Sequence, residues 1–389
     1  MQIFNVYDII HKIINNKIKM RLSQKQKILF IDNMGSLLNS GIPIFQVLDI
    51  IYFQTKAKNT KSLCLFLKKQ IEAGENLFKA SLKIPKVFNI FDVAMLEVGE
   101  ATGQIGKSFE TIAIKEEKEM DLKNKIIQAL IYPIAIIIIT ITMITVIMIY
   151  VIPKIEVMYK ESNTNLPALT EIVIATSHFF VNNGIYIIIF LSVLILGSIS
   201  LLKNKEIKYF FDKHILKIPL FGGIIKKKIL INFLDFLSIL LSSGIMINKA
   251  LLIIKNGSSN NYFAQEFENI IQEIKNGKPL SSSMGGDLLE IKLKQNSYKI
   301  SKNEMNILQE RAELFPIELS TAVKIGEQTG TLAQMLQKTS FRYTKEIDNI
   351  VKNLSTIMEP VIIVVIGLVV GVIVMAILLP FFNVANVVK

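Results

Sequence analysis

Three long apolar runs dominate the pattern of hydrophobic and polar positions along the chain. They cover residues 126–152, 184–202 and 360–388, and none contains a charged side chain. A helix needs about 20 apolar residues to cross a hydrocarbon core roughly 30 Å thick, and helices of soluble proteins normally keep a polar stripe. The pattern therefore predicts three membrane-spanning helices, at 126–152, 184–202 and 358–382.

Outside these runs, apolar residues recur every three or four positions, as at Ile28, Ile31 and Met34. This spacing is typical of amphipathic helices, and strand-like alternation is absent. Gly41 fits the C-terminal end of one helix, and Pro43 fits the first turn of the next. We therefore expect an all-α fold, with one bundle of about five or six short helices before the first span and another between the second and third spans.

Two segments of the chain repeat each other. LLNSGIPI at 37–44 matches LLSSGIMI at 240–247 at an offset of 203 residues, and VGEATG at 98–103 matches IGEQTG at 325–330 at an offset of 227. Ordered matches at constant offset indicate an internal duplication. The sequence therefore predicts two homologous helical-bundle domains, called here the first and the second copy.

The change of offset from 203 to 227 places an insertion of 24 residues in the second copy, at about 285–314. The offset of 227 also relates Pro133 to Pro360 and Pro153 to Pro380, so the repeat includes the span that follows each domain. These prolines would either simply terminate helices or shape helix ends where a partner's helices are received.

Charge predicts the orientation of the chain. Residues 1–125 contain 19 Lys and Arg against 13 Asp and Glu, residues 203–357 contain 22 against 15, and the loop 153–183 contains 2 against 3. Because basic segments stay on the cytoplasmic side of a membrane, we expect the first copy at 22–125 and the second at 203–357 to be cytoplasmic. The loop 153–183 and the tail 383–389 would be external.

The composition limits the ligands and covalent links that the chain is expected to have. The formal charge of +12 is largely explained by this topology, so direct binding of nucleic acid is not expected. The single cysteine, Cys64, excludes an intrachain disulfide, and His11, His178 and His214 lack the spacing of metal ligands. We expect no cofactor and no metal. The first 21 residues, 1–21, are interpreted as an amphipathic segment and not a signal peptide.

The stretch ATGQIGKS at 101–108 resembles a relaxed phosphate-binding loop. Such a loop follows a strand, whereas the preceding run has helical spacing. The second copy keeps GE-x-TG and discards the Gly-Lys-Ser. The shared motif is therefore GE-x-TG, and we expect neither nucleotide binding nor enzymatic activity. A nucleotide affinity that disappears in Lys107→Ala would support the opposite hypothesis, a nucleotide-dependent membrane enzyme.

Two interpretations of GE-x-TG are open. In one, it is a tight break between helices, with Thr102 or Thr329 capping the next helix. In the other, Glu100 and Glu327 have a partner, because a carboxylate near a helix C-terminus is otherwise disfavoured by about 0.3–1 kcal/mol. The partner would be a lysine of the domain, N–H groups of the following helix, or a second protein.

Taken together, the paired motifs and the three spans resemble the type II secretion system protein F family over roughly residues 22–382. IPLFGGIIKK at 218–227 also fits that family's entrance to the second domain. The resemblance implies a non-enzymatic, multi-pass platform protein of the bacterial inner membrane, with its N-terminus cytoplasmic and its C-terminus external.

Such proteins serve type II secretion, type IV pilus or competence machines. The implied partners are a cytoplasmic hexameric ATPase, the transmembrane helices of pilin or pseudopilin subunits, other inner-membrane assembly proteins and further copies of the chain. The alternative is a small membrane transporter subunit, although no charged residue lies inside the three apolar runs. A sensory protein is a further option, for which the external loop is small.

The resemblance also implies which residues form the family signature and could contact partners. These candidates are Gly99, Glu100, Thr102, Gly103, Gly326, Glu327, Thr329, Gly330, Gly41, Pro43 and Gly244. Met246 stands where the first copy has Pro43, so we expect that turn to be less constrained. Some members of the family bind calcium through acidic groups of the first domain, but no stretch here has the spacing of calcium ligands.

Overall fold

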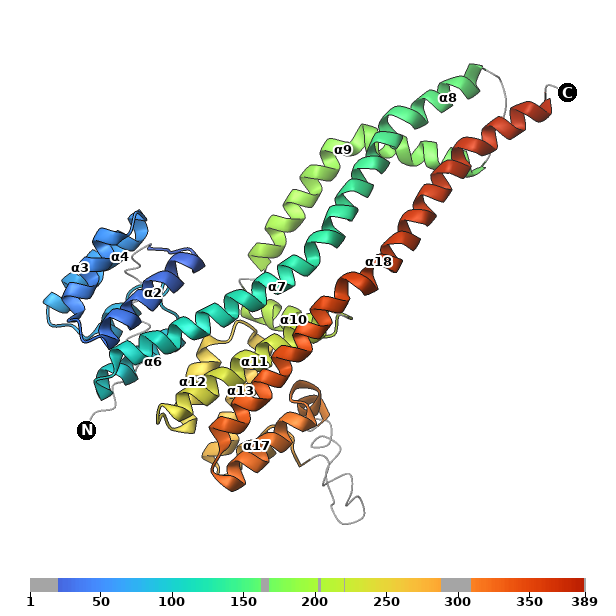
Figure 1. The fold of residues 1–389 in the computed structure, drawn as a ribbon. Helices are drawn as coiled ribbons and strands as arrows, with labels where there is room; N and C mark the ends of the chain where they lie inside the picture. The colour runs from blue at the N-terminus through green and yellow to red at the C-terminus, as the bar shows by residue number, and fades with distance from the viewer. Residues whose placement is uncertain (1–19, 162–167, 202–203, 220, 288–308, 388–389) are drawn as a thin grey trace, which may run out of the picture. The chain divides into compact units, whose positions relative to one another are not determined.

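The computed structural model describes residues 20–161, 168–201, 204–219, 221–287 and 309–387. Within these ranges the regular structure is helical and contains no strand, which confirms the predicted all-α fold (Figure 1). The principal helices are α2 (Gln24–Asn39), α3 (Ile44–Gln54), α4 (Lys58–Glu72), α5 (Leu77–Leu82), α6 (Ile90–Thr102), α7 (Ile105–Val146), η1 (Ile147–Val151), α8 (Ile152–Glu161), α9 (Ala168–Leu201), α10 (Lys205–Ile215), α11 (Phe221–Ser242), α12 (Ile247–Gly257), α13 (Asn261–Lys275), α14 (Leu280–Ser283), α17 (Ile317–Thr329) and α18 (Leu332–Val387).

Contacts divide the chain into two units. One contains residues 1–123 and 209–347, and the other contains residues 124–208 and 348–389. The first unit holds both copies of the repeated bundle, and the second holds the apolar helical segments. Most of the predicted insertion lies outside the described residues, as do residues 1–19 of the N-terminal segment.

Four helices of each copy begin at the offsets that the sequence motifs give. Helices α3, α4 and α5 begin 203 residues before α12, α13 and α14, and α6 begins 227 residues before α17. Gly41 and Gly244 follow equivalent helices with φ of 82° and 80°. Only glycine adopts such values without steric cost. The structure therefore confirms the duplication.

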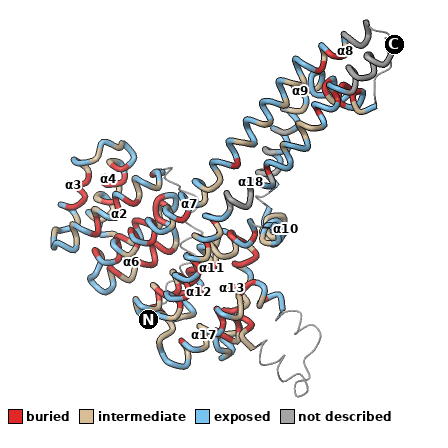
Figure 2. Tube along the Cα trace, turned by 45° about the vertical axis from the view of Figure 1, so that its right-hand side comes forward, coloured by how far each residue is buried: buried red, intermediate tan, exposed pale blue. Residues whose placement is uncertain are grey.

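Each copy buries a core of its own (Figure 2). In the first copy the Phe30 and Phe88 rings meet edge to face, with centroids 6.5 Å apart. In the second copy Phe233 stacks on Phe267 with centroids 5.0 Å apart, and Phe315 packs 6.2 Å from each of these rings. Buried aromatic rings in such arrangements contribute strongly to core stability.

Three of the described helices are much longer than the rest, and α9 contains 34 residues. Helix α7 contains 42 residues and α18 contains 56. Of the described helices, the stretch Ile105–Val157 is long and apolar enough to cross a bilayer, and a shorter apolar stretch, Ile362–Ala376, lies within α18. Most of the second predicted span lies within α9, and the third lies within α18. These two spans stay predictions.

The paired prolines do not end helices, contrary to the expectation of helix termination. Pro133 lies inside α7, Pro153 is the second residue of α8, and Pro360 and Pro380 lie inside α18. A proline ring crowds the carbonyl group four residues earlier. Immediately before Pro153 the backbone widens into the π-helix η1, and a π-helical turn is one way to accommodate an interruption of the helical ladder.

In the second unit, residues of three helices pack together. Ile155 of α8, Val173 of α9 and Ala376 of α18 belong to one buried apolar cluster. The Thr170 hydroxyl donates a hydrogen bond of 2.8 Å to the Ala376 carbonyl oxygen. Helical residues inside the predicted external loop, 153–183, are thereby tied to the third apolar segment.

Candidate functional site

The GE-x-TG motif builds the turn between two helices in each copy. Gly103 and Gly330 follow α6 and α17 in the left-handed region, with φ of 71° and 69°. The Gln104 N–H donates to the Gly99 carbonyl oxygen at 2.7 Å, and the equivalent bond of the second copy is 3.0 Å long. This is the Schellman pattern of helix termination, which requires a left-handed residue after the last turn. The last glycine of the motif supplies that residue.

The Glu100 carboxylate caps another helix of the first copy. Its Oε1 accepts a hydrogen bond from the Leu77 N–H at 3.1 Å, and its Oε2 accepts one from the Phe78 N–H at 3.3 Å. Both donors belong to the first turn of α5, where N–H groups have no partner within the helix and carry partial positive charge. This interaction offsets the unfavourable position of Glu100 near the C-terminus of α6.

The second copy has the same arrangement with one bond more. Glu327 accepts hydrogen bonds from the Leu280 N–H at 2.7 Å, from the Ser281 N–H at 3.1 Å and from the Ser281 hydroxyl at 2.6 Å. The donors lie at the start of α14. In both copies the carboxylate therefore bonds to a helix that precedes the motif, which was not among the three partners considered from the sequence.

The threonine hydroxyls of the motif bond back into their own helix, and not to the next helix as one of the two interpretations proposed. The Thr102 hydroxyl donates to the Val98 carbonyl oxygen, and the Thr329 hydroxyl donates to the Ile325 carbonyl oxygen, both at 2.8 Å. A threonine hydroxyl in the last turn of a helix can readily reach the carbonyl group four residues back. These side chains therefore satisfy the helix that they end.

The first glycine of the motif permits close packing. A Cβ atom on Gly99 would lie 2.2 Å from the Ser108 Oγ, and one on Gly326 would lie 2.8 Å from the Leu332 Cα. Ser108 and Leu332 belong to the starts of α7 and α18. The motif thus binds together three helices of each copy: a short capped helix, the helix that carries the motif, and the base of a long helix.

The remaining signature residues form the earlier turn. Gly41 ends the first helix of the pair, and Pro43 is the N-cap of α3. Met246 is the N-cap of α12 with φ and ψ of −59° and 141°, nearly the same as the −58° and 141° of Pro43. The turn therefore has the same backbone conformation without the proline ring.

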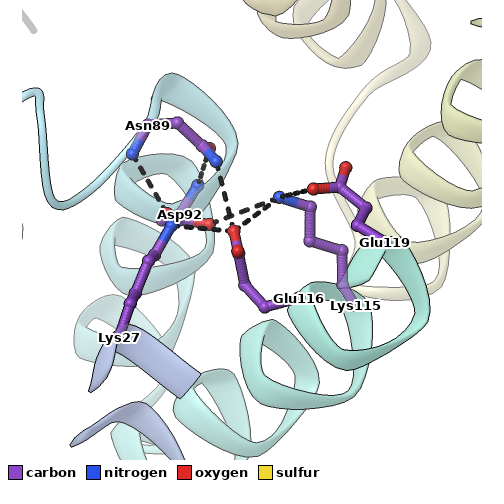
Figure 3. A network of polar contacts seen from close by, with 6 residues as sticks. All are labelled: Lys27, Asn89, Asp92, Lys115, Glu116 and Glu119. Atoms are coloured by element: carbon purple, nitrogen blue, oxygen red, sulfur yellow. Dashed lines mark hydrogen bonds and ion pairs between the residues drawn. The ribbon is translucent and has the colours of Figure 1, made fainter. Parts of the chain in front are cut away.

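A cluster of buried charges lies in the first copy, near the same helices (Figure 3). Lys27 of α2 places its Nζ 2.5 Å from the Asp92 Oδ2 and 2.7 Å from the Glu116 Oε1. Lys115 of α7 lies 2.9 Å from Glu116 and 3.5 Å from Glu119. The cluster therefore joins α2, α6 and α7 through ion pairs.

Burial and charge compete in this cluster. Burial raises the pKa of Asp92, and the nearby ammonium groups of Lys27 and Lys115 only partly oppose that shift. Burial also acts to raise the pKa of Glu116, but the same two lysines outweigh it and hold that pKa below its usual value. Asp92 also forms a capping box with Asn89 at the start of α6. The spacing of Asn89 and Asp92 was the one sequence signal that could have indicated this site.

The region between α6 and α7 lacks the structural context of a phosphate-binding loop. The stretch GEATGQIGKS runs from α6 through the turn into α7, without the strand that precedes a phosphate-binding loop. In the part of the chain that the structure describes, no three His, Cys, Asp or Glu side chains are grouped as metal ligands would be. In the buried cluster the positive charge beside the carboxylates is supplied by the ammonium groups of Lys27 and Lys115.

Comparison with known proteins gives the class of the molecule. The family model described as "Type II secretion system (T2SS), protein F" matches residues 30–153 and 233–380. The chain belongs to this family. The two matched segments start 203 residues apart and end 227 residues apart, so the family pattern occurs once in each copy.

Individual relatives span nearly the whole chain. The type IV pilus assembly protein PilC of Pseudomonas aeruginosa is 29% identical over 361 residues, which cover 92% of this chain and 90% of the relative. PilC of Thermus thermophilus is 26% identical over 360 residues, covering 92% and 82%. The type II secretion system protein F of Vibrio cholerae is 23% identical over 368 residues, covering 95% and 84%.

Proposed function

We propose that the protein is a multi-pass platform of the bacterial inner membrane that couples a cytoplasmic hexameric ATPase to the assembly of pilin or pseudopilin subunits. Membership of the protein F family supports the class of machine, and relatives named as type IV pilus assembly proteins favour a pilus. The protein acts as a mechanical connector and not as an enzyme.

One observation carries the proposal. Each GE-x-TG junction lies at the base of a helix that continues without interruption from the helical bundle into an apolar segment, α7 in the first copy and α18 in the second. The carboxylate cap and the close glycine contact hold that base against its own bundle. A movement imposed on the bundle would therefore be transmitted along a continuous helix.

Breaking the helix tests this connection. We would insert about two turns of glycine and serine after Lys123 in α7, and in a matched variant insert the same length of helix-forming alanine and glutamate. The flexible insertion should abolish surface pili at unchanged protein abundance, whereas the helical insertion should retain them. Equal piliation by both variants would show that helix continuity does not carry the coupling.

The ATPase would dock on the basic cytoplasmic bundles. On the first copy, Phe53 is 78% exposed beside the exposed Lys56 and Lys58, at the turn from α3 to α4. Lys58 is the first residue of α4, where a glutamate is compatible with the helix. Lys58→Glu in the full-length protein should reduce co-purification of the ATPase, while Lys154→Glu, on the predicted external side, should not. Equal retention would exclude this docking face.

A deletion strain would separate the remaining alternatives. Loss of surface pili, of protein secretion or of DNA uptake would identify the machine that the platform serves. Intact pili and secretion together with altered solute uptake by membrane vesicles would instead favour the small transporter subunit.

A further inference from the structure

Helix α10 (Lys205–Ile215) has its apolar side turned away from the protein. Ile207, Phe210, Phe211 and Ile215 follow the i, i+3, i+4, i+8 spacing of one helix face. Phe210 is 61% exposed, Phe211 53% and Ile215 39%, and no residue of α10 is buried. An amphipathic helix of a soluble bundle would show the reverse arrangement.

The polar face of α10 instead holds the helix on the second copy. The Asp212 carboxylate accepts a hydrogen bond of 2.6 Å from the Asn261 N–H, at the start of α13. The Tyr209 and Tyr262 rings meet edge to face at 5.5 Å, and the Lys213 ammonium lies 5.0 Å from the Tyr262 ring centroid. These contacts fix which face of α10 points outward, so the exposure of its apolar side is a property of the packed fold.

Two further apolar residues beyond the helix are exposed, and lysines accompany them. Ile218 is 46% exposed and Phe221 41%. Lys205 and Lys217, at either end of this segment, are also exposed. Helices that lie in a membrane surface have this composition, with Phe and Ile on one face and several Lys beside them.

Chain length limits how far α10 can be from an apolar helix. Helix α9 ends at Leu201, and α10 begins four residues later, at Lys205. Four residues of fully extended chain span at most about 14 Å. If α9 ends at the cytoplasmic membrane surface, as the predicted second span requires, α10 begins beside the lipid headgroups.

We propose that α10 is an interfacial helix whose Phe210, Phe211 and Ile215 side chains enter the cytoplasmic leaflet, while flanking lysines contact anionic headgroups. The proposal rests on the proposed membrane crossing of α9 and goes beyond the platform function. Because the polar face of α10 is bound to α13, the interface would fix the second bundle against the membrane. A second protein as occupant would not require lysines beside the apolar side.

Site-specific labels in the full-length protein, reconstituted in lipid nanodiscs, test this. Burial raises the pKa of the Cys64 thiol to about 12, so the native cysteine should not react. A fluorophore would be attached to Phe211→Cys, on the apolar side, or to Glu206→Cys, an exposed position on the polar side. Ile139→Cys on α7, which is 67% exposed, would serve as a marker of membrane insertion.

We expect quenchers attached to lipid chains to quench the Phe211→Cys label several-fold more strongly than the Glu206→Cys label. Iodide in the water should show the opposite order. Quenching at Phe211 by iodide alone would place the apolar side in water, and shielding from both quenchers would place it against protein. Either result overturns the proposal.

Two further measurements distinguish failure of the interfacial helix from failure of the membrane span, and test the role of the lysines. If the Ile139→Cys label is quenched from the lipid and the Phe211→Cys label is not, the interfacial helix fails while the membrane span stands. Replacing part of a phosphatidylcholine bilayer by anionic phosphatidylglycerol should strengthen lipid quenching at Phe211. An equal signal in both bilayers would overturn the role given to the lysines.

Discussion

The two copies have the same helices but place charge differently inside them. Three equivalent pairs of positions carry charges in the first copy and uncharged side chains in the second. These pairs are Lys27 and Leu230, Asp92 and Leu319, and Glu116 and Tyr343. At another pair of positions the pattern is reversed. The buried Arg311 of the second copy pairs with Glu266 at 3.4 Å. The equivalent residues of the first copy are the apolar Ile84 and Leu63.

The comparison teaches that the bundle does not need either set of charges to form. Buried ion pairs lose hydration when they form, so replacing a whole set by packed apolar residues is often neutral or stabilising, whereas removing one partner is costly. The charges therefore specify which helices meet in each copy, and do not supply the bulk of the stability. In the first copy they join α2, α6 and α7.

The largest expected effect comes from breaking one partner of the first copy's cluster. Lys27→Met leaves Asp92, which is fully buried, without its nearest cation. We expect the free energy of opening of the first copy to fall by about 3–5 kcal/mol. Hydrogen exchange of α2 and α6 would measure this, with α11 and α17 of the same molecule as the internal reference. Unchanged exchange in α2 would contradict the importance of the pair.

Transplanting the second copy's residues into the first should recover most of that loss. The variant combines Lys27→Leu, Asp92→Leu and Glu116→Tyr, with Lys27→Leu alone as the control. The triple variant removes the unpaired carboxylates together with the lysine, and Lys115 keeps Glu119 at 3.5 Å. Hydrogen exchange should show stronger protection of α2 than in the control. Equal protection in both would mean that the two interiors are not interchangeable.

A smaller effect should distinguish the two GE-x-TG junctions. Removing a carboxylate cap costs about 0.5–2 kcal/mol. Glu327→Ala should lie near the upper end of this range and Glu100→Ala lower, because Glu327 accepts three hydrogen bonds and Glu100 two. Exchange of the α14 and α5 amides measures both, and the matched Gln variants should lose less. Normal exchange combined with defective pilus assembly would instead indicate a partner contact for Glu100 or Glu327.

The smallest effect concerns the earlier turn. Met246→Pro should stabilise the second copy by about 0.4–1 kcal/mol, because a proline restricts the unfolded chain and Met246 already has the backbone angles of Pro43. Pro43→Met should destabilise the first copy by a similar amount. Thermal unfolding of the purified protein would compare the two. Destabilisation by Met246→Pro would show that the second turn requires its backbone N–H.

Much of the fold could be predicted from the sequence because the chain repeats itself. Helical spacing gave the all-α class, and the offsets of 203 and 227 gave the equivalent helices. Gly41 and Gly103 were identified as turn residues because a left-handed conformation leaves little choice other than glycine. These features depend on local sequence, which is why a pattern along the chain records them.

The site was less predictable because its contacts join distant segments. Glu100 bonds to Leu77 and Phe78, more than twenty positions earlier, and nothing local distinguishes that partner from a lysine. Lys115 and Glu116 lie in the charged run KEEKEMDLK, which has the composition of an exposed helix face, yet each is only 4% exposed. Contacts between residues that lie far apart in the sequence do not produce the periodic pattern by which a helix or a strand is predicted.

The length of α18 has a geometric consequence. At about 1.5 Å per residue, its 56 residues would extend over roughly 84 Å, nearly three times the thickness of a hydrocarbon core. Pivoting such a rod about its base by about five degrees would displace its far end by roughly 7 Å, more than one helical pitch. The Glu327 junction at that base would then act as a fulcrum, converting a small angular change into a displacement of several ångströms at the far end of the helix.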